Sequence, residues 1–353
     1  MTVRSAESIG LQSHRQLDRA SVAPLVSVII PVRNDARRLD LCLASIAASA
    51  YPADRYEIIV ADNGSTDNSR QVARARGARV VVFPDIRVSE VRNQAARAAR
   101  GQVLAFVDAD HVLEPDWLPF AIESLSKPDA AAVGAAYYAP ADGTWVQRMY
   151  DSFRTRAEGV LQVDWLGSGS LAVWREVFEK VAGFDSRLET CEDVDFCQRL
   201  RRNGFGLWSD NRLRSTHLGD PRTIRALFFG ELWRGRDNIK VSLRGPLTLR
   251  ALPSVVIPLA ILLLLTVAAG SIFALPGSWK LLLGALAGPL LLTSLRAGRM
   301  LSRIRRFDPL TLAQAFVVAL VYDTSRALAL VVRTPHRVRQ TASLSSRPTG
   351  TQA

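Results

Sequence analysis

Cysteine is scarce in this sequence, and the cysteines present form no framework. The 353 residues contain three, Cys42, Cys191 and Cys197, an odd number without the spacing of a metal site. Small secreted domains that depend on disulfides carry denser sets, so that class is excluded. The lack of a disulfide framework is consistent with a reducing cytosol.

The amino-terminal segment lacks a long apolar run. Residues 1–23 are polar and of mixed charge, which is not the pattern of a secretory signal peptide. We expect a disordered lead-in there. Repeats of fixed period and low-complexity tracts are also missing from the sequence, which gives no indication of a repeat or fibrous architecture.

Acidic residues are nearly absent from the carboxyl-terminal part. Residues 246–353 hold 12 Lys or Arg and two acids, Asp308 and Asp323, whereas residues 1–245 carry only +2 of the total net charge of +12. The basic part is also the apolar part. This combination favours contact with anionic lipid and argues against nucleic acid as a partner.

The same part contains long apolar segments. Residues 252–275 run for 24 positions without a charge, which is enough for one membrane span. A second segment, 279–296, is shorter between its charges, but Lys280 and Arg296 can extend toward the interface. We therefore expect membrane helices within residues 246–335. A buried helical domain of a soluble protein is the alternative, which the uncharged run disfavours.

A third apolar segment, 310–332, differs because it contains Asp323 and Arg326, one helical turn apart. Each would cost about 2.5–3.5 kcal/mol at mid-membrane if exposed to lipid. Arginines flank the segment on both sides, so a third crossing would place basic residues outside. We expect an interfacial or re-entrant helix rather than a third span, after a hairpin of two spans with both ends in the cytosol. A disordered tail is expected at 336–353.

Residues 24–245 alternate short apolar runs with amphipathic stretches. This alternation is typical of an α/β fold with a mainly parallel sheet and helices on both faces. The expected strands are 25–30, 57–61, 78–83, 102–107, 130–136 and 212–216, and the expected helices are 67–76, 88–99, 115–126, 144–158 and 192–204, with another that Asn34 or Asp35 caps.

Glycine is missing from the turn after the first expected strand, which is Pro31-Val32-Arg33-Asn34. A Rossmann-type dinucleotide-binding domain would carry Gly-x-Gly-x-x-Gly there, because its backbone must approach a pyrophosphate closely. The alternating pattern is therefore not that of a dinucleotide enzyme.

Two carboxylates follow the expected strand at 102–107. Asp108 and Asp110 are one residue apart, so in extended geometry both side chains point the same way. The carboxyl edge of an open α/β sheet is where ligands bind. Carboxylate ligands favour Mg²⁺ or Mn²⁺, which are often shared with the phosphates of a substrate. A polar turn is the simpler explanation for so short a motif taken alone.

The Asp-x-Asp motif has six companions in a fixed order over residues 26–217. Together they are Val26-Ser27-Val28-Ile29-Ile30-Pro31-Val32-Arg33-Asn34, Asp62-Asn63-Gly64-Ser65-Thr66-Asp67, Arg92-Asn93, Asp108-Ala109-Asp110, Gly167-Ser168-Gly169-Ser170, Gly183-Phe184-Asp185 and Glu192-Asp193. Each is weak alone. In this order they resemble the motifs of family 2 glycosyltransferases, whose GT-A fold is a nucleotide-sugar-binding α/β domain.

The resemblance implies a nucleotide site at the ends of the first strands. Pro31 and Arg33 would lie against the base, and Asp62 would accept a hydrogen bond from its imide N–H, which favours UDP-sugars. Arg92 would donate to the pyrophosphate. In a plainer interpretation, Asp62 is a turn residue and Arg92 a solvated arginine on a helix.

The resemblance also implies a divalent cation, Mg²⁺ or Mn²⁺. Asp110 would be the direct ligand, and Asp108 would contact the ribose or a water on the metal. His217 would complete the site, with a structural histidine as the alternative.

For catalysis the resemblance implies one base. Asp193 would deprotonate the acceptor hydroxyl and Glu192 would assist in positioning, although acids in a first helical turn also complement the macrodipole. Gly167 and Ser168 would lie beside the donor sugar and acceptor, where glycine allows close approach. Trp165 would offer an apolar face to a sugar ring, unless it is an ordinary core tryptophan.

Processive members of the family carry Gln-x-x-Arg-Trp after the base, and this sequence has no such motif. We therefore expect an inverting enzyme that moves one sugar from a nucleoside-diphosphate sugar to a lipid-linked or membrane-proximal glycan acceptor. It would act in cell-envelope glycan or glycolipid synthesis, on the cytosolic face of the cytoplasmic membrane. The alternatives are a nucleotidyltransferase on the same sheet and a catalytically silent membrane scaffold.

Overall fold

The computed structural model describes residues 23–156, 158–245, 252–273 and 279–332. The expected lead-in at 1–23 and tail at 336–353 fall outside them, except for Ala23. The chain forms two compact units, Met1–Pro140 with Thr155–Gly219, and Ala141–Arg154 with Asp220–Ala353. Residues 220–245, which were expected in the first domain, group with the carboxyl-terminal helices.

The first unit is built on a mixed, mostly parallel sheet of eight strands. Strand β1 (Val26–Val32) is parallel to neighbours on both sides, β2 and β4, and almost all of it is apolar and buried. In spatial order the strands are β3 (Arg79–Val82), β2 (Tyr56–Asp62), β1, β4 (Val103–Val107), β8 (Ser170–Trp174), β6 (Ala130–Gly134), β9 (Gly206–Asp210) and β7 (Val160–Gln162).

Strand direction changes at β8, which is antiparallel to both β4 and β6. β6 and β9 are parallel, and β7 and β9 are antiparallel. A separate small sheet pairs β5 (His111–Leu113) with β10 (Ser215–His217) in antiparallel register, so that His111 is opposite His217. The expected α/β class is confirmed, while the strand expected at 212–216 is shorter and includes His217.

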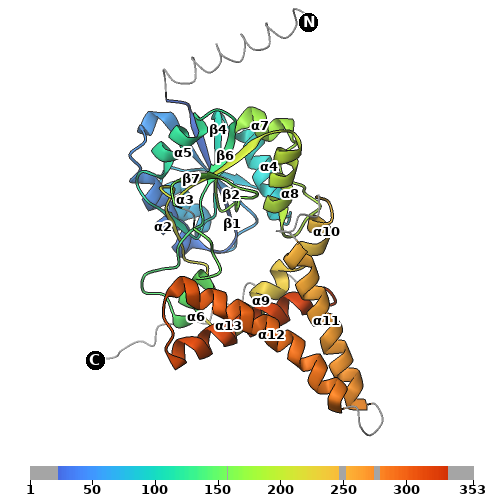
Figure 1. The fold of residues 1–353 in the computed structure, drawn as a ribbon. Helices are drawn as coiled ribbons and strands as arrows, with labels where there is room; N and C mark the ends of the chain where they lie inside the picture. The colour runs from blue at the N-terminus through green and yellow to red at the C-terminus, as the bar shows by residue number, and fades with distance from the viewer. Residues whose placement is uncertain (1–22, 157, 246–251, 274–278, 333–353) are drawn as a thin grey trace, which may run out of the picture. The chain divides into compact units, whose positions relative to one another are not determined.

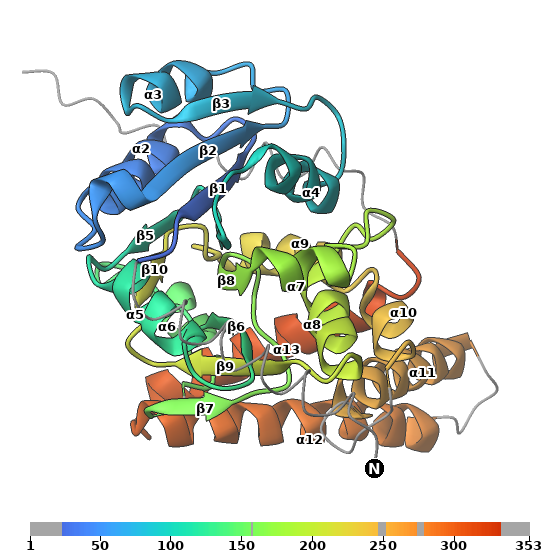
Figure 2. The same cartoon turned by 90° about the horizontal axis from the view of Figure 1, so that it is seen from above.

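Helices cover both faces of this sheet, as expected (Figures 1 and 2). In α2 the buried residues Leu39, Cys42, Leu43 and Ile46 recur at helical spacing and form the face that packs inward. The helices of this unit are α2 (Ala36–Ala47), α3 (Ser69–Ala75), α4 (Val88–Ala98), α5 (Trp117–Leu125), α7 (Arg175–Lys180) and α8 (Glu192–Arg202), with a short 3-10 turn, η1 (Ala53–Arg55).

The second unit is helical. Helix α6 begins with a capping box of Thr144 and Gln147 and ends at Asp151, earlier than expected. Helix α13 begins where Asp308 accepts the backbone N–H of Thr311, with proline at the first helical position. The helices are α6 (Trp145–Asp151), α9 (Ile224–Arg234), α10 (Asn238–Ser242), α11 (Leu252–Phe273), α12 (Trp279–Ile304) and α13 (Pro309–Leu328).

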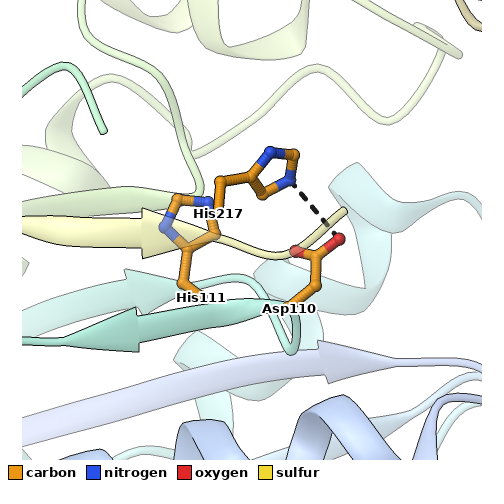
Figure 3. Close-up of side chains that lie close together, drawn as sticks. All are labelled: Asp110, His111 and His217. Carbon is orange, nitrogen blue, oxygen red and sulfur yellow. Dashed lines mark ion pairs between the residues drawn. The ribbon is translucent and has the colours of Figure 1, made fainter. Parts of the chain in front are cut away.

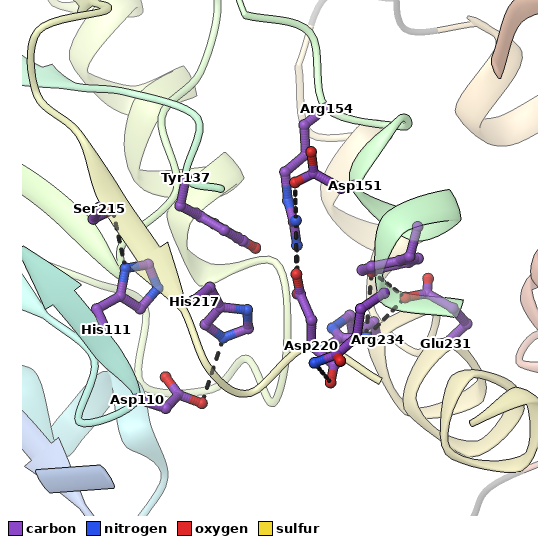
Figure 4. A network of polar contacts seen from close by, with 12 residues as sticks. Asp110, His111, Tyr137, Asp151, Arg154, Ser215, His217, Asp220, Glu231 and Arg234 are labelled. Carbon is purple, nitrogen blue, oxygen red and sulfur yellow. Dashed lines mark hydrogen bonds and ion pairs between the residues drawn. The ribbon is translucent and has the colours of Figure 1, made fainter. Parts of the chain in front are cut away.

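Among the described residues, two helices are long and apolar enough to cross a membrane, α11 over Leu252–Ser271 and α12 over Trp279–Ile304. The charged residues of α13 are paired within this unit. Arg296 on α12 donates to Asp323 at 2.8 Å, and Arg326 donates at 2.7 Å to Glu231 on α9. Arg234 also donates to Glu231, as Figure 4 shows. These pairs reduce the cost of burying the charges that distinguished segment 310–332.

Candidate active site

Three potential metal ligands meet where β4 ends. Asp110 follows that strand, His111 begins β5, and His217 ends β10. Because β5 and β10 pair with His111 opposite His217, the chain brings together residues that lie far apart in sequence. One ligand atom from each of the three lies within 4.8 Å of the others (Figure 3). The expected meeting of Asp110 and His217 is therefore present in the structure.

Asp110 is held in a way that fits a cation ligand. Its Oδ2 lies 3.4 Å from His217 Nε2, and its backbone carbonyl accepts the N–H of Leu218 at 2.8 Å. A Cβ added to Gly219 would lie 2.0 Å from the same Oδ2, so only glycine leaves room for the carboxylate. Burial alone would raise the pKa of Asp110, but His217 and His111 outweigh it and hold that pKa below its usual range. The carboxylate is thus an anion.

His111 was not singled out from the sequence. Its Nδ1 lies 3.3 Å from Ser215 Oγ, and its ring centroid is 4.8 Å from that of His217 and 4.9 Å from that of Tyr137 (Figure 4). A contact at one ring nitrogen orients the other toward a ligand, as in many metal sites. The available signal was a histidine directly after the Asp-x-Asp motif, one of only four in the chain.

The second group of site residues surrounds Asp193, at the start of α8. Its carboxylate accepts the N–H of Val194 at 2.8 Å and also a backbone N–H from Ser168. Burial raises the pKa of Asp193 to about 7, and the neighbouring charge of Glu192 contributes to the rise. A carboxyl group with this pKa can accept a proton near neutral pH.

The turn at Gly167 lies beside this carboxylate. A Cβ on Gly167 would be 3.9 Å from Asp193 Oδ2 and 3.9 Å from the ring of Trp165. Trp165 is 58% exposed, so it is not a core tryptophan. Its indole ring is available as an apolar surface close to the proposed base.

Arg92 contacts one residue next to each of these two groups, Asp108 near the metal-ligand group and Glu192 beside Asp193. It is buried, and its Nη1 and Nη2 donate at 2.7 Å to Glu192 and to Asp108, respectively. Arg92 was expected to contact a pyrophosphate as a bidentate donor, but in this structure both terminal nitrogens bind protein carboxylates. The alternative of a solvated helix-face arginine is wrong. Asp108, expected near a ribose, is bound on one oxygen by this guanidinium.

The residues expected at the nucleobase lie at the ends of β1 and β2. The carboxylate of Asp62 is fully buried and accepts the Ser65 N–H at 3.1 Å, which is the turn role that the sequence left open. Pro31 is half-buried. Arg33 is exposed and pairs with Asp85 at 3.1 Å. In this conformation Asp62 is not accessible to a ligand.

Two named proteins are similar in sequence to this chain. The glycosyltransferase AglE of Haloferax volcanii is 29% identical over 245 residues, which cover 65% of this chain and 78% of that protein. The succinoglycan biosynthesis protein ExoA of Rhizobium meliloti is 24% identical over 255 residues, covering 66% of this chain and 74% of that protein.

Among solved structures, the mannosyltransferase PcManGT from Pyrobaculum calidifontis in complex with GDP-Man and Mn²⁺ has a similar fold. The TM-score is 0.54 over 89% of this chain and 92% of that one, at 18% identity. The family model described as Glycosyl transferase family 2 matches residues 27–203. The chain therefore belongs to family 2 of the glycosyltransferases and has their GT-A fold.

Proposed function

We propose that this glycosyltransferase moves a single sugar from a nucleoside-diphosphate sugar to an acceptor hydroxyl, with inversion at the anomeric carbon. The observation that carries the proposal is the presence of two complementary sites in the first unit. One is the anionic Asp110 with two histidines, and the other is Asp193, whose pKa is about 7.

The donor side of the proposed site is the group of Asp110, His111 and His217. One carboxylate and two imidazoles suit Mn²⁺ better than Mg²⁺, because Mg²⁺ prefers oxygen ligands. A cation there would stabilise the negative charge of the departing diphosphate. The fold relative PcManGT, solved with GDP-Man and Mn²⁺, supports a nucleoside-diphosphate sugar as donor.

The proposed nucleobase of the donor is uracil or guanine. A preference for UDP-sugars rested on Asp62, whose buried carboxylate already accepts the N–H of Ser65. The geometry therefore gives no separate support to uracil. The proposed donors are UDP-sugars and GDP-sugars.

On the acceptor side, Asp193 takes the hydroxyl proton while the acceptor oxygen attacks the anomeric carbon. The bond from that carbon to the diphosphate oxygen breaks, and the pair of electrons leaves with the diphosphate. Glu192 is held by Arg92 at 2.7 Å and is assigned to positioning. A single catalytic carboxylate is sufficient because the diphosphate leaves without protonation, unlike the leaving group of a glycosidase.

For the second unit we propose a membrane role. Helices α11 and α12 would form a hairpin with both ends in the cytosol, and α13 would be interfacial or re-entrant. The apolar helices and the excess of Lys and Arg over residues 246–353 support this arrangement. The acceptor would then be lipid-linked or membrane-proximal.

The proposal is tested by screening UDP-sugars and GDP-sugars against the purified full chain, with and without Mn²⁺. At least one should raise the unfolding temperature in the presence of Mn²⁺ and release its nucleoside diphosphate slowly in the absence of acceptor. Neither effect with any sugar, or release that does not need a divalent cation, would refute the proposed donor chemistry.

A further inference from the structure

Arg38, near the start of α2, also lies close to the proposed metal ligand Asp110. Its Nη1 lies 3.6 Å from Asp110 Oδ2, the same oxygen that lies 3.4 Å from His217 Nε2. Neither the sequence motifs nor the mechanism above assigns a role to this arginine. Its side chain is partly buried rather than extended into solvent.

Asp35 fixes the direction of this guanidinium. Arg38 Nε donates to Asp35 Oδ1 at 2.9 Å, and Nη2 lies 2.6 Å from Oδ2. This two-point contact sets the plane of the group and directs the remaining Nη1 toward Asp110. Asp35 occupies the N-cap position of α2, yet its side chain makes no capping hydrogen bond. The expected N-cap position is therefore confirmed at Asp35, but its carboxylate contacts Arg38 and does not make the capping hydrogen bond.

A divalent cation and Arg38 would oppose each other at Asp110. A cation held by Asp110 and His217 would lie close to a guanidinium that Asp35 prevents from turning away. The positive charges of the cation and of the Arg38 guanidinium would repel each other, and this repulsion is stronger in a partly buried site than in water. Arg38 should therefore weaken binding of the cation when no donor is present.

A bound diphosphate would reverse the sign of this effect. It brings more negative charge than one divalent cation neutralises, and its oxygens are good acceptors for a guanidinium. The diphosphate would then be an anionic partner for Arg38 Nη1, which the contact with Asp35 directs toward the proposed metal site. Without the diphosphate, Nη1 would face the cation alone. The same arginine should strengthen binding of the nucleotide once the cation is in place.

We propose that Arg38 couples the two binding steps, opposing the divalent cation alone and favouring the cation together with a nucleoside diphosphate. The inference rests on the proposed function, because it places a cation on Asp110 and His217. It makes donor and metal bind cooperatively. Arg38 is a binding residue in this account and takes no part in proton transfer.

The test uses Arg38→Ala and Arg38→Gln in the full-length chain, with Arg37→Ala as the matched control. Arg37 is the preceding residue, is exposed, and has no acidic partner among the described ion pairs. Binding of Mn²⁺ alone is measured by electron paramagnetic resonance, and binding of UDP and of GDP at saturating Mn²⁺ by calorimetry. In both Arg38 variants the dissociation constant for Mn²⁺ should fall about tenfold and that for the nucleotide should rise about tenfold, as expected for one charge-assisted contact.

Opposite shifts cannot come from damage to the fold, which would weaken both ligands. Parallel weakening, unchanged constants, or the same shifts in Arg37→Ala would each overturn the coupling. A wild-type protein that binds no Mn²⁺ would also overturn it. Failure of the proposed function is recognised separately, as a wild-type protein that binds Mn²⁺ but neither UDP nor GDP, and it would overturn the coupling as well.

Discussion

Glu192 and Asp193 show how adjacent acids acquire different roles at the residue scale. Glu192 is buried, and Arg92 donates a hydrogen bond to its carboxylate at 2.7 Å. Burial, together with the neighbouring charge of Glu192, raises the pKa of Asp193 to about 7. Asp193 is therefore the proposed base, while the carboxylate of Glu192 is engaged by Arg92.

Replacing Asp193 with asparagine removes the proton acceptor with little change of shape. Donor binding should be retained, while turnover falls by ~10²–10⁴. The measurement is kcat for transfer together with the dissociation constant of the donor. Glu192→Gln is the comparison, with a smaller loss expected, and a larger loss in that variant would mean that the two assignments must be exchanged.

The raised pKa of Asp193 also predicts a pH profile. The base is the ionised form, so kcat should fall about tenfold for each pH unit below about 7 and level off above it. The stability of the folded protein should change with pH in the opposite direction to kcat. The protonated form is favoured by folding, and its contribution is lost as pH rises through about 7, so Asp193→Asn should raise the unfolding temperature at pH 8. A flat rate profile between pH 5 and 8 would exclude this base.

At the scale of elements, the turn after β10 packs against the proposed metal site. Gly219 packs so tightly against Asp110 that an added methyl group would lie 2.0 Å from Oδ2. Gly219→Ala should displace the carboxylate and weaken Mn²⁺ binding at least tenfold, measured by paramagnetic resonance. The control is Gly298→Ala on α12, where a Cβ meets nothing within 4 Å and affinity should not change. Equal affinities in the two variants would contradict the assigned ligand.

The strands of the first unit differ in how well the local sequence predicts them. Strands β1, β2 and β4 are short apolar runs between helical patterns, and local periodicity identifies them. The β5–β10 pair has three residues in each strand and joins positions about a hundred residues apart, which no local pattern reveals. For that reason His111 was missed.

The contacts of individual side chains could not all be predicted from the local sequence pattern either. From the motifs, Arg92 was expected at a pyrophosphate and Asp62 at a nucleobase. A motif gives the position of a residue in the chain, but it does not say which groups the side chain contacts. The structure gives Arg92 two carboxylate partners and places Asp62 in a closed turn. The partner of Arg92, Glu192, is one hundred residues away and is brought in by tertiary folding. The partner of Asp62 is the backbone N–H of Ser65, three residues on, which is the turn role that the sequence had offered as the alternative.

At the scale of the whole molecule, the uneven distribution of charge predicts topology. Basic residues before α11 and after α12 should stay in the cytosol, which a two-span hairpin satisfies. A cysteine introduced at position 345 should therefore resist an impermeant thiol reagent in intact cells and react after permeabilisation. Labelling in intact cells would establish a third crossing and refute the hairpin.

The central claim is that a divalent cation on Asp110 binds the donor, and calorimetry with and without Mn²⁺ tests it most directly. In the wild-type chain the affinity for the nucleotide sugar found by screening should rise at least tenfold when Mn²⁺ is added, because the cation bridges carboxylate and diphosphate. In Asp110→Asn the affinities with and without Mn²⁺ should be equal, in a protein that still unfolds cooperatively. A wild-type affinity that does not depend on Mn²⁺, or an Asp110→Asn variant that keeps the dependence, would contradict the account.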